Sequence, residues 1–230
     1  IRYWDLRYCE NLEVQNIEDK LSQPKPDKIA LNGPLAFESF QDKNQRLTNY
    51  VEVEALRYLY LSKISLNLLK KGNIKKNDIL ILGDYNTRVT KNMLGLIDGL
   101  NPSILKKYNL NYKSHPAYEP NLKDYKNLNV NKVDAPLSEL LINSDVVITS
   151  GNSAATIEAI LMNCKTIIIT ENDNINFSPL RNDKSLIFIR EVKELEESIN
   201  DLSTIAQTIK RNKIFWLNSK IPRWKKLLNI

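Results

Sequence analysis

The stretch 145–170 constrains the fold of this chain more than any other. It begins with an apolar, β-branched run at 146–148 and continues through turn-forming residues at 149–153. Helical spacing follows over 154–162, and a second apolar β-branched run occupies 166–169. Such runs are typical of strands that are buried on both faces of a parallel sheet. The stretch therefore predicts a strand–helix–strand unit with parallel strands and a right-handed crossover.

The turn between the first strand and the helix is the candidate anion site of this unit. It lies at the carboxyl end of a parallel strand, where ligands of open α/β sheets bind. It also lies at the amino end of a helix, whose unpaired N–H groups favour a phosphate or carboxylate. Gly151 allows close backbone approach, and the candidate side chains are Ser150, Asn152, Ser153 and Thr156. The alternative is structural, because Ser153 can cap the helix and Gly151 can turn the chain.

Strands and helices alternate along the chain from residue 29 to residue 211. The predicted strands outside the stretch above are 28–31, 78–82, 110–113, 127–131 and 185–189. The predicted helices are 50–71, 88–100, 136–143 and 191–211, the last with a break near Asn200. This alternation predicts an α/β fold with a doubly wound, Rossmann-like parallel sheet.

We expect three segments along the 230 residues. Residues 1–27 form an N-terminal segment with a stiff Pro-Lys-Pro-Asp linker, 28–212 form the Rossmann-like domain, and 213–230 form a basic, aromatic C-terminal helix. The first segment is too short for a Rossmann domain, and the sequence starts at Ile1. We therefore expect it to be the remnant of, or the connection to, an N-terminal domain that is missing from this sequence.

Composition and charge exclude several classes of function. No apolar run approaches the roughly 20 residues that span a bilayer. The single histidine excludes a multi-histidine metal site, and Cys9 and Cys164 lack metal-binding spacing, so no metal is expected. We expect Cys164 to be a free thiol in a reducing compartment. The net charge of +6 favours anionic ligands or an anionic surface, but scattered basic residues without a recognition motif disfavour nucleic acid.

Polar or glycine-bearing turns follow four predicted strands, and the carboxyl ends of parallel strands meet at one edge of a sheet. The first three turns contain Gly33, Asp84 and the pair His115–Pro116, and the fourth is the turn at 150–153. His115 can donate to a phosphate, and as a cation it can stabilise the charge on a departing phosphate. Pro116 keeps His115 extended. The alternative for His115 is an ordinary surface-loop residue.

Three further side chains are candidate ligand contacts. Arg88 can pair with a phosphate or carboxylate, or can be a solvated residue in the first turn of a helix. Asp84 can accept a sugar hydroxyl or can be a turn residue. Glu158 can bind ribose hydroxyls, or can be an exposed carboxylate near a helix start. Neither a dinucleotide-binding glycine fingerprint nor a P-loop is present.

The order of these motifs resembles the C-terminal, nucleotide-binding half of GT-B glycosyltransferases. The resemblance rests on Lys-Ser-His-Pro116, the Pro136-Leu-Ser-Glu-Leu-Leu helix, and Ser144-Asp-Val-Val-Ile-Thr-Ser-Gly-Asn-Ser-Ala-Ala-Thr-Ile-Glu-Ala159. More narrowly, His115–Pro116 and the Ser/Thr-rich turn resemble the paired motifs of bacterial sialyltransferases, polysialyltransferases and capsule Kdo-transferases. The chain also resembles bacterial surface-carbohydrate biosynthesis proteins.

The resemblance implies a function and a set of roles. The implied substrate is a nucleotide sugar, CMP-activated before UDP-activated, with no separate cofactor and a glycan or lipid-linked acceptor. His115 would contact the donor phosphate and assist its departure, and Glu158 would hold ribose. Ser150, Ser153 and Thr156 would hold phosphate. Inverting GT-B enzymes usually take the catalytic base from their N-terminal domain, so the resemblance assigns no catalytic base to this chain.

Two alternatives to the transferase remain open: a GT-B-like UDP-sugar epimerase or hydrolase, and a non-catalytic binding module. For the tail, Phe215, Trp216 and Trp224 are expected to pack on another domain. The alternative is a peripheral contact with the inner membrane, in which the basic residues of the tail face anionic headgroups and its tryptophans lie in the interface. These residues are Lys220, Arg223, Lys225 and Lys226. Either way the expected location is the cytoplasm.

Overall fold

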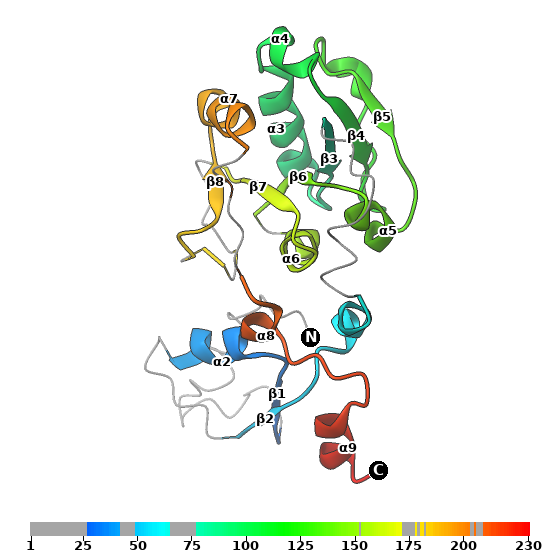
Figure 1. Cartoon of the computed structure of the whole chain (residues 1–230), viewed down its shortest axis with the longest axis vertical. Coiled ribbons are helices and arrows are strands. Elements are labelled where there is room, and N and C mark those ends of the chain that lie inside the picture. The colour runs from blue at the N-terminus through cyan, green and yellow to red at the C-terminus, as the bar shows by residue number, and fades with distance from the viewer. Residues whose placement is uncertain are drawn as a thin grey trace, which may run out of the picture. The chain divides into compact units, whose positions relative to one another are not determined.

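The computed structural model describes residues 27–41, 49–64, 77–151, 153–171, 178, 180–181, 183–202, 205 and 209–230. The chain divides into two compact units. The larger unit is Ser65–Thr208, and the smaller unit combines Ile1–Ile64 with Ile209–Ile230. Strands β3 to β8 belong to the larger unit, and β1 and β2 belong to the smaller one (Figure 1).

The larger unit is built on a parallel sheet of six strands. These are β3 (Asp78–Leu82), β4 (Asn109–Lys113), β5 (Val130–Lys132), β6 (Val146–Ser150), β7 (Lys165–Ile169) and β8 (Ile187–Ile189). Their spatial order is β5-β4-β3-β6-β7-β8, and every pair is parallel. In order of appearance this is 3-2-1-4-5-6, the Rossmann order, and the chain reverses direction across the sheet between β3 and β6. The predicted fold class is confirmed.

Helices cover both faces of this sheet (Figure 1). They are α3 (Thr87–Asp98), α4 (Pro102–Leu105), α5 (Leu137–Ile142), α6 (Ala154–Leu161) and α7 (Val192–Asn200), with a short 3-10 turn at Leu122–Asp124. Met93 and Leu94 of α3 and Leu195 of α7 pack in one core cluster with alternate strand residues. Helices α5 and α6 contact each other, and α6 also packs on β6 and β7. All five residues of β6 are buried, as expected for a strand covered on both sides.

Side chains at the helix starts fix the positions of the turns. The amide oxygen of Asn86 accepts the N–H groups of Arg88 and Val89 at the start of α3. Ser153 accepts the N–H of Ala155 at the start of α6, at 3.2 Å. Caps of this kind satisfy backbone donors that the helix itself leaves unpaired, so each strand-to-helix turn has a defined conformation.

The smaller unit contains β1 (Ile29–Leu31), α2 (Pro34–Gln41), β2 (Tyr50–Glu52), the 3-10 helix η1 (Leu56–Ser62), α8 (Arg211–Ile214) and α9 (Pro222–Leu228). Strands β1 and β2 form a parallel pair. The C-terminal segment lies against them, because Trp216 donates its N–H to Asn32 and accepts the N–H of Ala55, at 3.1 and 3.0 Å. Tyr58 and Phe215 stack with ring centroids 4.4 Å apart.

Two sequence predictions are wrong in this unit. The strand at 28–31 was expected in the large sheet, but β1 pairs only with β2 in a sheet of two strands. A helix was expected over 50–71, but 50–52 is strand and 56–62 is 3-10 helix, while 65–71 lie outside the described residues. Backbone hydrogen bonds to the distant β1 and to Trp216 replace the local helical ones. Tertiary context thus overrides the helical spacing of the apolar residues.

The C-terminal region also differs from the prediction of one interrupted helix over 191–211. Helix α7 ends at Asn200, and Arg211 begins the separate helix α8. The Arg211 guanidinium donates to the carbonyls of Leu61 and Ile64, at 2.7 and 2.8 Å. Arg211 and both acceptors belong to the smaller unit, which takes in Ile209–Ile230. The boundaries predicted from the sequence were 27/28 and 212/213. The predicted segment 1–27 lies, except for Asp27, outside the described residues.

None of the helices in the described part of the chain combines the length and the apolarity needed to cross a membrane. Cys164 is buried and is not part of a disulfide, as predicted. Cys9 lies outside the described residues.

Candidate functional site

The carboxyl edge of the large sheet is the candidate site. Strands β3 and β6 are neighbours at the point where the strand order reverses, and ligands of doubly wound sheets bind at such a point. Gly83 and Asp84 follow β3, and Ser150 ends β6. The sequence predicted that these turns would meet, and the pairing of β3 with β6 brings them together.

Asp84 and Ser150 are joined directly. The Ser150 hydroxyl donates to one carboxylate oxygen of Asp84, and the other oxygen accepts the N–H of Asn86 at 2.8 Å. The Asp84 N–H donates to the Thr90 hydroxyl, which in turn donates to the Asp84 carbonyl, both at 2.9 Å. Asp84 and Ser150 are each 1% exposed. The pair therefore fixes the two strand exits against each other beneath the site.

Thr156 and Ser153 have internal partners as well. The Thr156 hydroxyl donates to the Ser150 carbonyl at 2.6 Å and lies 3.2 Å from the Thr149 hydroxyl, and it is fully buried. Ser153 is the N-cap residue of α6, so the structural alternative for this residue, helix capping, is the one observed. Gly151 donates its N–H to Ile169 at 3.0 Å, which ties the turn to β7. The polar side chains of this turn thus hold α6 on the end of β6.

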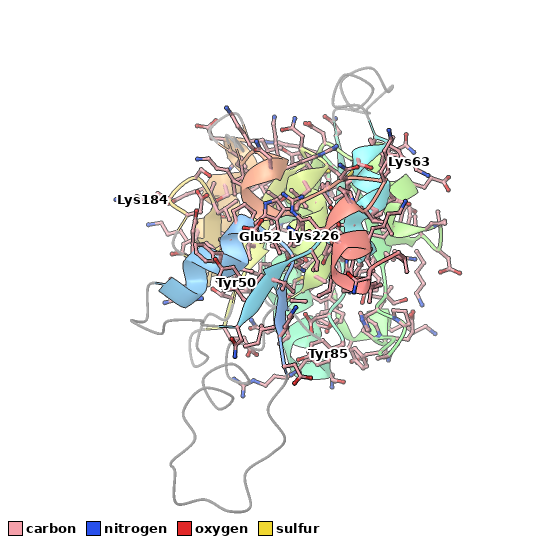
Figure 2. All side chains as sticks on the ribbon, turned by 90° about the horizontal axis from the view of Figure 1, so that it is seen from below. Tyr50, Glu52, Lys63, Tyr85, Lys184 and Lys226 are labelled. Atoms are coloured by element: carbon pink, nitrogen blue, oxygen red, sulfur yellow. The ribbon has the colours of Figure 1, made fainter. Side chains whose placement is uncertain are left out.

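His115 lies at the exit of β4, beside the β3 exit. Its Nδ1 accepts the N–H of Ala117 at 3.1 Å, so in the neutral ring the proton is on Nε2 and that nitrogen is a donor. The His115 ring meets the Tyr85 ring edge-on, with ring centroids 6.2 Å apart. Tyr85 is half-exposed and is labelled in Figure 2. Pro116 is exposed in the turn that follows, which the Tyr118 N–H closes on the His115 carbonyl at 2.9 Å.

Gly83 is required for the close approach of these two exits. A Cβ at this position would lie 3.2 Å from the backbone nitrogen of His115 and 2.7 Å from the Tyr112 hydroxyl. The Tyr112 hydroxyl is buried, and no hydrogen-bond partner for it lies among the described residues. Burial raises its pKa, and the Glu119 carboxylate adds to the shift. Tyr112 therefore stays neutral next to the candidate site.

Arg88 lines an open groove at the same edge. The groove has a volume of about 740 Å³ and is lined by Asn86, Thr87, Arg88, Lys91, Asn92, Glu171 and Arg190; we call it the basic groove. Its walls come from the first turns of α3 and from the exits of β7 and β8. The Arg88 Nε donates to Glu171 at 3.0 Å, and 65% of the Arg88 side chain remains exposed. Three cations and one carboxylate give the groove a net positive charge that suits an anionic ligand.

Three predicted site residues lie elsewhere or are not described. Gly33 belongs to the smaller unit, where a Cβ would lie 1.8 Å from the carbonyl oxygen of Ile214, so close packing of two backbone segments explains this glycine. Glu158 lies on α6, is 7% exposed and interacts within the chain. Asn152 lies outside the described residues.

Sequence reasoning missed several lining residues of the basic groove, above all Glu171 and Arg190. Both follow predicted strands almost directly, Glu171 after β7 and Arg190 after β8. The rule that strand exits share one edge would have included them. Within the described ranges, no group of three or more His, Cys, Asp or Glu side chains is arranged to hold a metal ion.

Comparison with known proteins supports the fold. No protein-family model matches the chain, and neither does any curated protein sequence. Among solved structures, the UDP-GlcNAc 2-epimerase of Methanocaldococcus jannaschii, crystallised with UDP-GlcNAc and UDP, is similar, with a TM-score of 0.59 and 13% identity. The match covers 88% of this chain and 61% of that chain, so this chain spans about three-fifths of the epimerase's length. The chain is thus similar in fold to a GT-B-like enzyme, in agreement with its Rossmann-like parallel sheet, and at this identity the likeness concerns the fold alone.

Proposed function

We propose that this chain binds a nucleotide sugar at the carboxyl edge of its six-stranded sheet, as the donor-binding half of a glycosyltransferase. The observation that supports this most is the basic groove, which is open, about 740 Å³ in volume, and lies beside the Asp84–Ser150 pair. A nucleotide sugar carries one or two phosphates, and Arg88, Lys91 and Arg190 would compensate their charge.

We propose different roles for the residues around this edge of the sheet. His115 would donate from Nε2 to a phosphate oxygen and would stabilise the charge that develops when the bond between sugar and phosphate breaks. Arg88 would bind phosphate through the guanidinium nitrogens that Glu171 does not use. Asp84, Ser150 and Thr156 would position the turns, because their side chains are buried and internally bonded. The small exposure of Glu158 favours the same structural role over a contact with ribose.

By the resemblance of the His115–Pro116 and Ser/Thr motifs, the donor would be a CMP-activated sugar acid, and the product a bacterial surface polysaccharide such as a capsule. The acceptor would be a glycan or a lipid-linked glycan. The base that removes the acceptor proton is not assigned to any residue of this chain.

A second candidate is a UDP-sugar epimerase or hydrolase of GT-B-like fold. The observation that favours it is the similarity to a UDP-GlcNAc 2-epimerase. Such an enzyme would use the same edge of the sheet but would convert its substrate without an acceptor. A non-catalytic nucleotide-binding module is the third candidate, since this architecture hosts many functions.

Thermal unfolding in the presence of nucleotides tests the proposal. We expect CMP or UDP at millimolar concentration to raise the melting temperature of the wild type and to raise that of His115→Ala much less. Incubation with UDP-GlcNAc alone, followed by sugar analysis, separates the candidates: epimerisation or hydrolysis would identify the second one. No shift with CMP, UDP or GDP would argue against nucleotide binding altogether.

A further inference from the structure

The positive charge of this protein is concentrated at one end of the chain. Residues 202–230 contain seven Lys and Arg residues and no Asp or Glu, whereas residues 1–201 contain 26 basic and 27 acidic residues. The net charge of +6 therefore comes entirely from the C-terminal segment. The excess of basic residues is thus confined to one segment, whereas basic and acidic residues balance in the rest of the chain.

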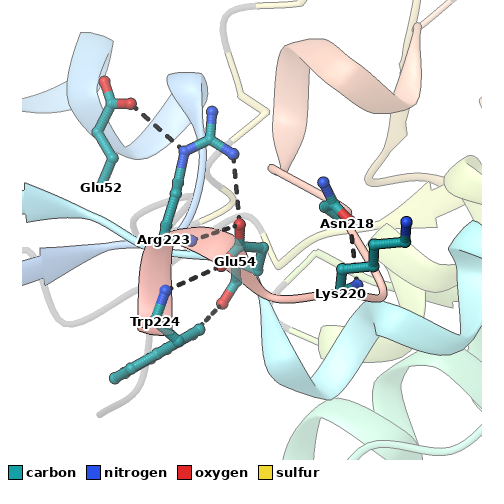
Figure 3. A network of polar contacts seen from close by, with 6 residues as sticks. All are labelled: Glu52, Glu54, Asn218, Lys220, Arg223 and Trp224. Carbon is teal, nitrogen blue, oxygen red and sulfur yellow. Dashed lines mark hydrogen bonds and ion pairs between the residues drawn. The ribbon is translucent and has the colours of Figure 1, made fainter. Parts of the chain in front are cut away.

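Helix α9, near the end of this segment, is anchored by one buried carboxylate (Figure 3). The two Glu54 oxygens accept the N–H groups of Arg223 and Trp224, both at 3.2 Å, and the Glu54 carbonyl accepts the Trp224 indole N–H at 2.8 Å. The Glu54 side chain is completely buried. Its charge also suits the positive end of the helix. Helix α9 therefore has a fixed orientation on the smaller unit, although none of its residues is buried.

Arg223 is the basic residue of α9 whose charge is compensated. Its guanidinium lies 3.6 Å from a Glu52 oxygen and 3.5 Å from a Glu54 oxygen, and 5.1 Å above the Trp216 ring. Lys220, Lys225 and Lys226 are exposed, and Lys226 is labelled in Figure 2. No carboxylate in the described residues forms an ion pair with these lysines. These three cations face solvent.

Exposed apolar side chains lie next to these lysines. The Leu228 side chain is 56% exposed and that of Ile230 is 79% exposed. Only four large hydrophobic residues in the described part of the chain are exposed, and these two are the most exposed of the four. The Ile230 N–H donates to the Lys225 carbonyl at 3.1 Å, so the chain folds back and holds Ile230 beside the last turn of α9. We call Lys220, Lys225, Lys226, Leu228 and Ile230 the C-terminal patch.

We propose that the C-terminal patch binds the surface of an anionic lipid bilayer. Its lysines would approach the headgroup phosphates, and Leu228 and Ile230 would enter the interface between headgroups and acyl chains. This combination of cations with exposed aliphatic residues favours a bilayer over nucleic acid, for which stacking aromatic side chains would be expected. The Trp224 indole N–H donates to the Glu54 carbonyl, so this aromatic ring is held on the smaller unit and is not a free stacking platform. The contact is peripheral, and it would place the chain where lipid-linked acceptors are found.

Sedimentation with lipid vesicles tests this proposal. We expect the full chain to bind vesicles that contain phosphatidylglycerol and not vesicles of phosphatidylcholine alone, with binding that weakens as salt is added. Removing two lysines in Lys225→Gln/Lys226→Gln should weaken binding about 25-fold, because each lysine near an anionic surface contributes about fivefold. Leu228→Ser should weaken binding at all salt concentrations.

The matched control is Lys106→Gln/Lys107→Gln, which removes the same charge from two exposed lysines of the larger unit. It should bind vesicles like the wild type, and circular dichroism should show that both double variants are folded. Equal loss in the two double variants would mean that net charge alone matters, and would overturn the proposal. So would binding to a labelled RNA oligonucleotide without binding to anionic vesicles, or equal binding to neutral vesicles.

Discussion

Ser150 donates its hydroxyl hydrogen to the buried carboxylate of Asp84, and this bond joins the ends of the two strands between which the sheet reverses direction. Ser150→Ala would leave one oxygen of a buried carboxylate without its donor. We expect a loss of about 1–3 kcal/mol in the free energy of unfolding, measured in urea. Ser103→Ala, at an exposed serine of α4, is the control and should change stability by less than about 0.5 kcal/mol. Equal losses in the two variants would mean that the pair has no structural role.

Gly33 and Gly95 give a matched pair of glycine substitutions. Gly33→Ala should be strongly destabilising, because the new Cβ would lie 1.8 Å from a backbone oxygen of Ile214. Gly95→Ala in the middle of α3 should stabilise by about 0.5–1 kcal/mol, since its Cβ would meet nothing within 4 Å and alanine favours helix. Melting temperatures of the two variants check this. A tolerated Gly33→Ala would contradict the packing explanation and would reopen a ligand-binding role for Gly33.

Glu54 and Glu52 are two carboxylates near α9 with different burial. Glu54→Gln should release α9, because an amide offers one acceptor oxygen where the carboxylate offers two, and we expect a loss of about 1–3 kcal/mol. Hydrogen exchange of the Arg223 and Trp224 amides should become fast in this variant. In Glu52→Gln it should stay slow, because Glu52 is half exposed and its carboxylate pairs with the Arg223 guanidinium rather than with the backbone N–H groups of α9. Fast exchange in the wild type would show that Glu54 does not hold the helix.

Cys164 provides a prediction about pH. Burial raises the pKa of its thiol to about 12, with a smaller contribution from the Asp145 carboxylate. At pH 8 the folded protein should therefore resist alkylation at Cys164, and the same residue should react in urea, as read by mass spectrometry of its peptide. The unfolded chain would lose this proton near pH 9 and the folded chain only near pH 12. The free energy of unfolding should therefore fall as the pH rises above 9, and it should fall by less in Cys164→Ala.

The central strand–helix–strand unit could be predicted from the sequence because its signals are local. The apolar β-branched residues of β6 and β7 indicate buried strands whatever lies elsewhere in the chain, and the observed bounds, 146–150 and 165–169, differ little from the predicted ones. The smaller unit could not be predicted in this way. Strand β2 exists because Tyr50–Glu52 pairs with Ile29–Leu31. That pairing is long-range and leaves no periodic pattern in either segment.

The candidate site was predicted in part, for the same reason. Strand exits are local signals, so Asp84, His115 and Ser150 could be assigned to one edge before the structure was known. Whether a hydroxyl faces a ligand or an internal partner depends on neighbours that are distant in sequence. Thr156 is an example, since it is fully buried against the end of β6. Gly33 is another, because the backbone it approaches is 181 residues further along the chain.

Calorimetric titration of the chain with CMP, UDP and GDP tests the proposed nucleotide-sugar site most directly. We predict saturable binding at a single site, weakened at least tenfold in His115→Ala and in Arg88→Gln, because each removes a donor to phosphate that is worth about 1.5–3 kcal/mol. Lys106→Gln, which removes a charge from the larger unit outside the basic groove, should bind like the wild type. Preference for CMP would support the sugar-acid transferase, and preference for UDP the epimerase. No heat of binding with any of the three nucleotides, from protein that is folded, would contradict the proposal.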